Sequence, residues 1–160
     1  MSIHARFFLL AAITLAWPTA ARANIGDDIS QLRGRYGAAK QFANQMLFHV
    51  RITDDGVAAM PPSADQHEGY SLAVYFDGAH SAMEIFTRNT SDPEKMEISK
   101  QDIDHILASE GEGSSWNPVQ VRSGKPTWIR ADQKLIARFS SNASGESDEA
   151  SVLVIMLNAK

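Results

Sequence analysis

Cysteine is absent from all 160 residues of the chain. Without thiols the protein can form no disulfide, no thiolate metal site and no cysteine nucleophile, and it offers no attachment point for a bacterial lipoprotein anchor. Dense clusters of lysine and arginine are also missing, since 15 basic residues stand against 19 acidic ones for a formal net charge of −4. An acidic surface repels phosphate groups, so the composition argues against binding to nucleic acid or to an anionic membrane.

A long hydrophobic segment of the kind that spans a bilayer is lacking as well. The apolar run Phe7–Trp17 is about eleven residues long, whereas a membrane-spanning helix needs about 20. It follows the basic residues His4 and Arg6, and Pro18 and the small residues of Ala21-Arg22-Ala23 come after it. This order of basic start, apolar run and small-residue cleavage site is typical of a secretory signal peptide.

We therefore predict that Met1–Ala23 is removed before Asn24 and that residues 24–160 form a single domain. Cleavage would take away two arginines and no acidic residue, so the mature chain would carry 13 basic and 19 acidic residues, a net charge of −6. It would keep no stable membrane anchor. We expect a soluble bacterial protein in the periplasm or outside the cell. The alternative reading of the apolar run is a buried N-terminal helix.

Helical and strand patterns follow one another in the predicted domain. Asp27 and Asp28 precede a short helical pattern that ends at Gly37. The segment Met46–Thr53 alternates apolar and polar side chains with the period of a half-buried strand. The proline-containing stretch Ala58–Gly69 cannot continue a sheet, so it predicts a surface loop.

A β-hairpin is the clearest pattern in the chain. Tyr70–Asp77 alternates regularly and runs into the turn residue Gly78. The return strand places Met83 and Ile85 on one face and Glu84 on the other. We therefore predict an antiparallel pair of strands here.

The second half of the domain repeats the change from helix to strands. A helical pattern between Ser99 and Gly111 has cap residues at both ends, and a loop containing Trp116 follows it. Residues 126–130 and 134–139 predict a second hairpin, although its turn offers no glycine. The apolar run 152–157 predicts a strand that is buried on both faces or lies in mid-sheet.

These segments predict the order helix, three strands, helix, three strands, or αβββαβββ. Short turns between strands favour antiparallel pairing. We therefore expect an α+β domain in which an antiparallel sheet of about six strands carries two short helices packed on one face. The order also raises the hypothesis of two similar halves, although no motif can be aligned between them.

Two segments resemble a group of small exported bacterial proteins that have a signal peptide and no assigned activity. In that group a helix ending in Tyr-Gly, here Leu32–Gly37, precedes a strand closing in Phe-x-Gly, here Tyr70–Gly78, and a Trp-containing segment such as Trp128–Asp132 follows. The first half is also distantly similar to the helix-plus-sheet units of outer-membrane assembly lipoproteins and of secreted β-lactamase-inhibitor proteins. Those proteins bind other proteins, so the resemblance implies binding and transfers no residues.

Motifs for catalysis and metal binding are not found. The histidines have neither the H-E-x-x-H spacing nor another spacing that would put two ligands on one helix face, and G-x-S-x-G is missing. We accordingly predict no catalytic residues, no metal site and no cofactor. A hydrolase would need residues from distant segments to converge, for example His49 with Asp77 or Glu84.

Exposed aromatic side chains are the remaining candidates for a functional site. Tyr75, Trp116 and Trp128 could form a contact surface for a protein partner, because such side chains supply large contact areas with a polar tip. The alternative is that the two tryptophans fill the core. We expect a protein that acts by contact with an envelope or extracellular protein; the alternative is a small exported hydrolase without a recognisable motif.

Overall fold

The computed structural model describes residues 25–92, 96–141 and 150–159. The predicted signal peptide lies outside the described residues, so the signal peptide and its cleavage before Asn24 stay predictions. Among the described residues, no helix has the length and apolar character needed to cross a membrane. The elements are α1 (Ile29–Tyr36), β1 (Ala39–Gln41), β2 (Gln45–Thr53), β3 (Gly56–Ala59), β4 (Tyr70–Asp77), β5 (His80–Arg88), α2 (Lys100–Glu110), β6 (Trp116–Val119), β7 (Thr127–Arg130), β8 (Leu135–Ser140) and β9 (Val152–Leu157).

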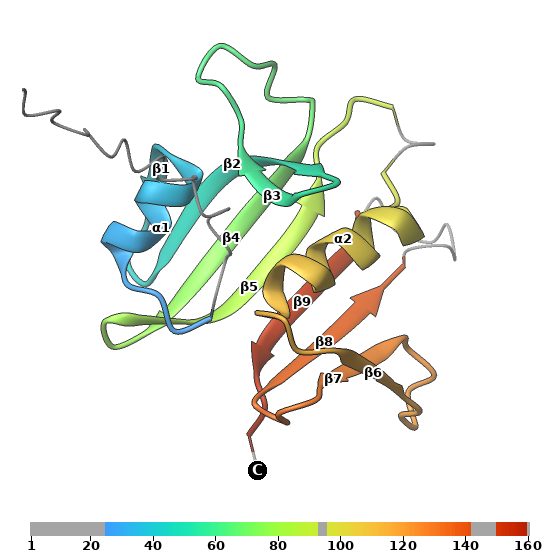
Figure 1. The fold of residues 1–160 in the computed structure, drawn as a ribbon. Helices are drawn as coiled ribbons and strands as arrows, with labels where there is room; N and C mark the ends of the chain where they lie inside the picture. The colour runs from blue at the N-terminus through green and yellow to red at the C-terminus, as the bar shows by residue number, and fades with distance from the viewer. Residues whose placement is uncertain (1–24, 93–95, 142–149, 160) are drawn as a thin grey trace, which may run out of the picture.

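The strands form one sheet of nine strands within the described part of the chain (Figure 1). Its order is β1-β2-β4-β5-β9-β8-β7-β6, and β3 pairs with β2 beside β1. Every pairing is antiparallel. The expected α+β class with an antiparallel sheet is therefore confirmed.

Apart from β3, which pairs back onto β2, the two halves of the sheet have the same topology. In each half a helix comes first, and the strands that follow run from an outer edge of the sheet to its centre. The first half reaches the centre with β5 and the second with β9, and these two strands pair with each other. The similarity lies in the path of the chain, and the hypothesis of a sequence repeat stays a prediction.

Local capping interactions set the limits of α1. The Asp28 side chain accepts a hydrogen bond from the backbone N–H of Gln31, and the Gln31 side chain accepts one from the backbone N–H of Asp28. This capping box supplies partners for two of the N–H groups that a helix start leaves free. Gly37, with a φ of 75°, ends the helix as its position in the sequence predicts.

Helix α2 also begins and ends at its predicted caps. The Ser99 hydroxyl oxygen accepts a hydrogen bond from the backbone N–H of Asp102 at 3.1 Å. Gly111 at the other end has an ordinary helical φ of −74°. A glycine is needed there for space, because a Cβ atom would stand 2.6 Å from the carbonyl oxygen of Ser114.

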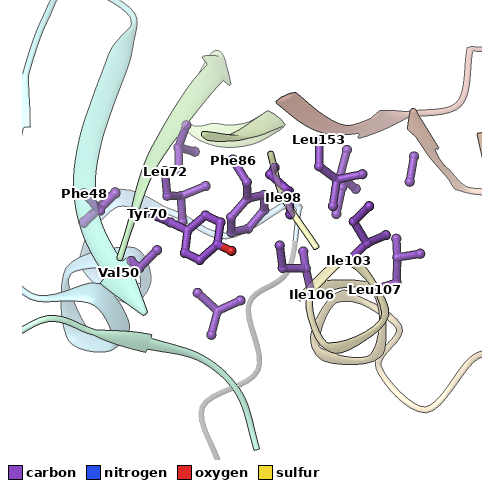
Figure 2. Close-up of a cluster of buried hydrophobic side chains, with 14 of the residues drawn as sticks. Phe48, Val50, Tyr70, Leu72, Phe86, Ile98, Ile103, Ile106, Leu107 and Leu153 are labelled. Atoms are coloured by element: carbon purple, nitrogen blue, oxygen red, sulfur yellow. The ribbon is translucent and has the colours of Figure 1, made fainter. Parts of the chain in front are cut away.

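Both helices pack on the same face of the sheet, where the core lies (Figure 2). Tyr36 of α1 makes an edge-to-face contact with Phe48 of β2 at 5.4 Å between ring centroids. From α2, Ile103, Ile106 and Leu107 point toward the side chains of the sheet. We call this helix-covered side the inner face and the opposite side the open face.

The expected number of strands is too low by three. Strands β1, β3 and β6, each of three or four residues, do not appear in the predicted order αβββαβββ. The predicted loop Ala58–Gly69 begins with two residues of β3, and Trp116 lies at the start of β6 instead of in a loop. Such short strands exist through pairing with a longer neighbour, which a sequence pattern of three or four residues does not reveal.

The second predicted hairpin is present. Its turn contains no glycine, and another residue adopts the positive φ angle. Strands β7 and β8 pair around Ala131–Lys134. Gln133 adopts a φ of 60°, a left-handed conformation that a non-glycine residue seldom takes. The backbone N–H of Gln133 donates to the carbonyl oxygen of Arg130 at 2.7 Å, which closes the turn.

Candidate functional site

The open face of the sheet is the most distinctive surface of the molecule. Among the described residues, both helices lie on the inner face, so no helix covers the open one. Residues that are partners in antiparallel register stand on the same face of a sheet, and the registers of the strand pairs therefore define rows of side chains across the strands. Two such rows are largely apolar.

The first row crosses seven strands. Its centre is formed by Tyr75, Met83 and Met156. Met83 of β5 is the cross-strand partner of both Tyr75 of β4 and Met156 of β9. Each is partly exposed. From one edge to the other, the row consists of Gln45, Tyr75, Met83, Met156, Ile136, Ile129 and Asn117.

The second row runs beside the first and crosses eight strands. Ala73, Ile85 and Val154 occupy its centre on β4, β5 and β9, and all three are partly exposed. From edge to edge, the row consists of Lys40, Leu47, Ala73, Ile85, Val154, Arg138, Thr127 and Val119.

The two rows together make a continuous apolar area across the middle of the open face. The two rows are neighbours on β4, β5 and β9, and their apolar side chains follow one another there without a polar side chain between them. A face of a sheet that is exposed to water ordinarily carries polar side chains. A contiguous apolar patch on such a face marks a site of contact with another molecule.

The charged side chains in the two rows all have one sign. Lys40 and Arg138 belong to the second row, and Arg51 stands further along β2. No carboxylate occupies a described position in the two rows, although the whole chain has a net charge of −4. The apolar rows are thus flanked by cationic side chains, while Asp77 at the end of β4 places a carboxylate on the same face outside the rows.

Strand β5 buries an ionisable side chain and exposes apolar ones, which is the opposite of what a strand with one face in water ordinarily does. Glu84 points to the inner face and is completely buried, whereas Met83 and Ile85 point to the open face and are partly exposed. The sequence predicted correctly that Glu84 lies opposite Met83 and Ile85. It did not show which side faces the helices, because alternation alone does not decide which face a helix covers.

The three aromatic residues proposed as a contact surface do not lie on the same face. Tyr75 stands in the first row of the open face. Trp116 and Trp128 lie on the inner face, where both are partly buried and pack against the core. The indole N–H of Trp116 donates to the carbonyl oxygen of Leu107 in α2 at 2.6 Å. Trp128 lines a groove beside the start of α2, together with Ile103 and other residues.

The residues considered for a hydrolase are not brought together. His49 is on the open face of β2, and its Nε2 atom lies 2.5 Å from the carbonyl oxygen of Glu68. Glu84 is buried on the opposite face, and Asp77 stands at the far end of β4 from Ser71, the partner of His49. The sheet itself separates His49 from Glu84, and the length of β4 separates His49 from Asp77.

Ser71, a second polar residue near His49, does not form a catalytic pair with it. Ser71 is the cross-strand partner of His49, but its hydroxyl donates to the side-chain oxygen of Asn89 at 2.8 Å. A nucleophilic serine requires a hydrogen bond to its base. These residues line a groove beneath the loop between β3 and β4. Among the described residues, no group of three His, Asp or Glu side chains is placed to hold a metal ion.

Comparison with known proteins does not extend this description. The chain matches no protein-family model, and neither the curated proteins nor the solved structures contain a match to it. The geometry and chemistry of the described residues therefore carry the functional inference.

Proposed function

We propose that this protein acts by binding another protein through the open face of its sheet. The observation that carries the proposal is the pair of apolar rows across β4, β5 and β9, on the side away from both helices. Tyrosine and methionine, which lie at the centre of the first row, are enriched in the buried parts of protein interfaces. The area spans several adjacent strands and has the continuity that a docking surface needs.

The cationic side chains beside the apolar rows favour a partner with an acidic rim. Lys40, Arg51 and Arg138 would face acidic side chains around an apolar patch on the partner. Opposite charges at the rim of an interface increase the association rate and select the orientation of the two proteins. We therefore propose an acidic, amphipathic protein surface as the occupant.

We further propose that the encounter takes place in the bacterial periplasm or outside the cell. This part rests on the signal-peptide pattern of Met1–Ala23, which predicts a mature chain beginning at Asn24. Identification of the N-terminal residue of the protein purified from its host tests it. A chain that keeps Met1 in the cytoplasm would contradict it.

The alternative of a small exported hydrolase has no supporting observation among the described residues. His49, Asp77 and Glu84 are distributed over two faces and two ends of the sheet. A binding function needs no such convergence.

Site-specific crosslinking tests the proposed surface directly. A photoreactive amino acid would replace Ile85 on the open face, and in a matched protein it would replace Ala108, which is exposed on α2. We expect one protein to be crosslinked in the host from position 85 and not from position 108. Equal crosslinking from both positions would contradict the proposal, as would crosslinks from position 85 to lipid or to a second copy of the chain.

Charge reversal adds a quantitative control. Arg138→Glu changes a cationic residue of the second row, and Arg122→Glu makes the same change in an exposed loop residue outside both rows. Once the partner is identified, we expect Arg138→Glu to weaken binding about tenfold or more and Arg122→Glu to leave it unchanged. Equal affinities for the two variants would refute the role of the open face.

A further inference from the structure

Two glutamate side chains meet in the interior between the sheet and α2. Glu84 comes from the central strand β5, and Glu110 is the last residue of α2. Both have 0% of their surface exposed. None of their four carboxyl oxygens has a hydrogen-bond partner among the described residues, and each carboxyl group is close enough to change the ionisation of the other.

A third polar group shares this region without a partner. The hydroxyl of Tyr36, at the end of α1, is buried and has no described hydrogen-bond partner. Burial raises the pKa of Tyr36 well above its usual value, and the charges of Glu84 and Glu110 raise it further. Three elements therefore bring unpaired acidic groups to one place, which is rare in protein interiors.

The nearby cations are already engaged by other carboxylates. Arg35 of α1 forms an ion pair with Asp27, which lies just before that helix. Arg130 of β7 forms ion pairs with Glu112 and Asp132.

The position of Glu110 adds to the cost of ionisation. The last turn of a helix carries the negative end of the helix dipole, which disfavours a carboxylate there. Arg130 also donates a hydrogen bond to the backbone carbonyl of Glu110 at 3.2 Å, so this arginine serves the backbone and not the buried carboxyl oxygens.

Protonation of the two buried carboxyl groups removes the unfavourable charge from the interior. Burial, and next the charge of Asp27, raise the pKa of Glu84 from 4.5 to about 7. Burial and the charge of Glu84 raise the pKa of Glu110 well above its usual value. Two neutral carboxyl groups can donate and accept hydrogen bonds between themselves, whereas two carboxylates at the same place repel each other.

We propose that Glu84 and Glu110 form a proton-dependent latch that holds the end of α2 on the central strand of the sheet. When both side chains are protonated, the latch is closed and the helix layer is packed on the sheet. As the pH rises, negative charge appears in the interior, and the end of α2 loosens from β5. The device would make the conformation of the protein follow the pH of its compartment.

The direction and size of the effect follow from proton linkage. Because the folded protein binds the proton of Glu84 more tightly than the unfolded chain does, stability is fully present below the unfolded pKa and declines as the pH rises toward and through the folded one. A shift of the Glu84 pKa from 4.5 to about 7 raises the equilibrium constant for unfolding about 70-fold between pH 5 and pH 8. Glu110 would extend the decline to higher pH.

Trp116 is a natural reporter of the latch. Its indole N–H donates to the carbonyl of Leu107, three residues before Glu110 in α2. We would record near-ultraviolet circular dichroism and urea unfolding of the full chain between pH 5 and pH 9. Wild type and Glu68→Gln, which changes an exposed loop carboxylate, should show the same loss of signal and of stability with rising pH.

The double variant Glu84→Gln and Glu110→Gln should lose this pH dependence, because a glutamine side chain stays neutral at every pH tested. A pH profile of the double variant that matches the wild type would overturn the proposal. If the variant does not fold, the carboxyl carbon resonances of wild-type Glu84 and Glu110 provide the second measurement by NMR. We expect at least one of them to titrate near pH 7; titration of both below pH 5 would overturn the proposal.

Discussion

Gly69 and Gly78 provide a matched test of how closely the backbone is packed where β4 begins. Both residues have positive φ angles, 73° and 63°, which side chains other than glycine adopt at a cost of about 1–2 kcal/mol. A Cβ atom on Gly78 would meet nothing within 4 Å. One on Gly69 would stand 2.5 Å from the backbone carbonyl oxygen of Val50.

The difference between the two sites predicts different costs for the same substitution. Val50 lies within β2, which is paired on both sides with β3 and β4, so its carbonyl cannot move freely. A shift of Gly69 itself would disturb the hydrogen bond that its carbonyl accepts from the N–H of Asn89 at 2.9 Å. Forcing an extra methyl group into a packed site costs about 1–3 kcal/mol. We expect Gly69→Ala to destabilise the protein by about 2–5 kcal/mol in total and Gly78→Ala by about 1–2 kcal/mol.

Urea denaturation followed by far-ultraviolet circular dichroism measures both variants. The midpoint urea concentration should fall more for Gly69→Ala, with the slope of the transition unchanged, because the surface exposed on unfolding stays the same. Thermal unfolding should show a decrease of about 2–4 °C for each kcal/mol lost. If the two variants lose the same stability, the contact between residue 69 and β2 carries no energy and the reasoning is wrong.

Two further substitutions test contacts at the start of α2. Ser151→Ala removes a buried hydroxyl that accepts from the N–H of Ile98 at 2.8 Å and donates to the carbonyl of Met96 at 3.1 Å; we expect a loss of about 1–3 kcal/mol in urea unfolding, and an unchanged midpoint would refute the role of this bridge. Ser99→Ala removes the N-cap of α2, and we expect a loss of about 1 kcal/mol that Ser99→Thr restores, because a hydroxyl can both accept from the N–H of Asp102 and donate to its carboxylate. A Ser99→Thr protein as unstable as Ser99→Ala would contradict the capping role.

The features that sequence patterns predicted best are held by interactions between near neighbours in the chain. The caps of both helices depend on side chains that reach three residues along the backbone, such as Asp28 with Gln31 and Ser99 with Asp102. The turn at Gly78 between β4 and β5 depends on a single residue with a positive φ. Composition and alternation therefore sufficed to predict the α+β class, both helices and the main hairpin.

The candidate binding face could be predicted only in part. Tyr75 was singled out as an aromatic contact residue, and it stands on the open face. Its neighbours Met83 and Met156 are 73 residues apart in the chain and meet only because β5 pairs with β9. The alternation of β5 identified its two faces without showing that the helices would cover the side that carries Glu84.

The amino-acid sequence by itself determined the local structure and the chemical limits of this protein. The absence of cysteine excludes thiol chemistry, and the capping residues and alternating segments specify where helices and strands form. Only the tertiary structure decided which face of the sheet is covered, which strands meet at its centre, and that Glu84 and Glu110 share one buried site. The reason is physical: caps and turns depend on neighbours a few residues away, whereas pairing and burial depend on residues that come together only when the whole chain folds.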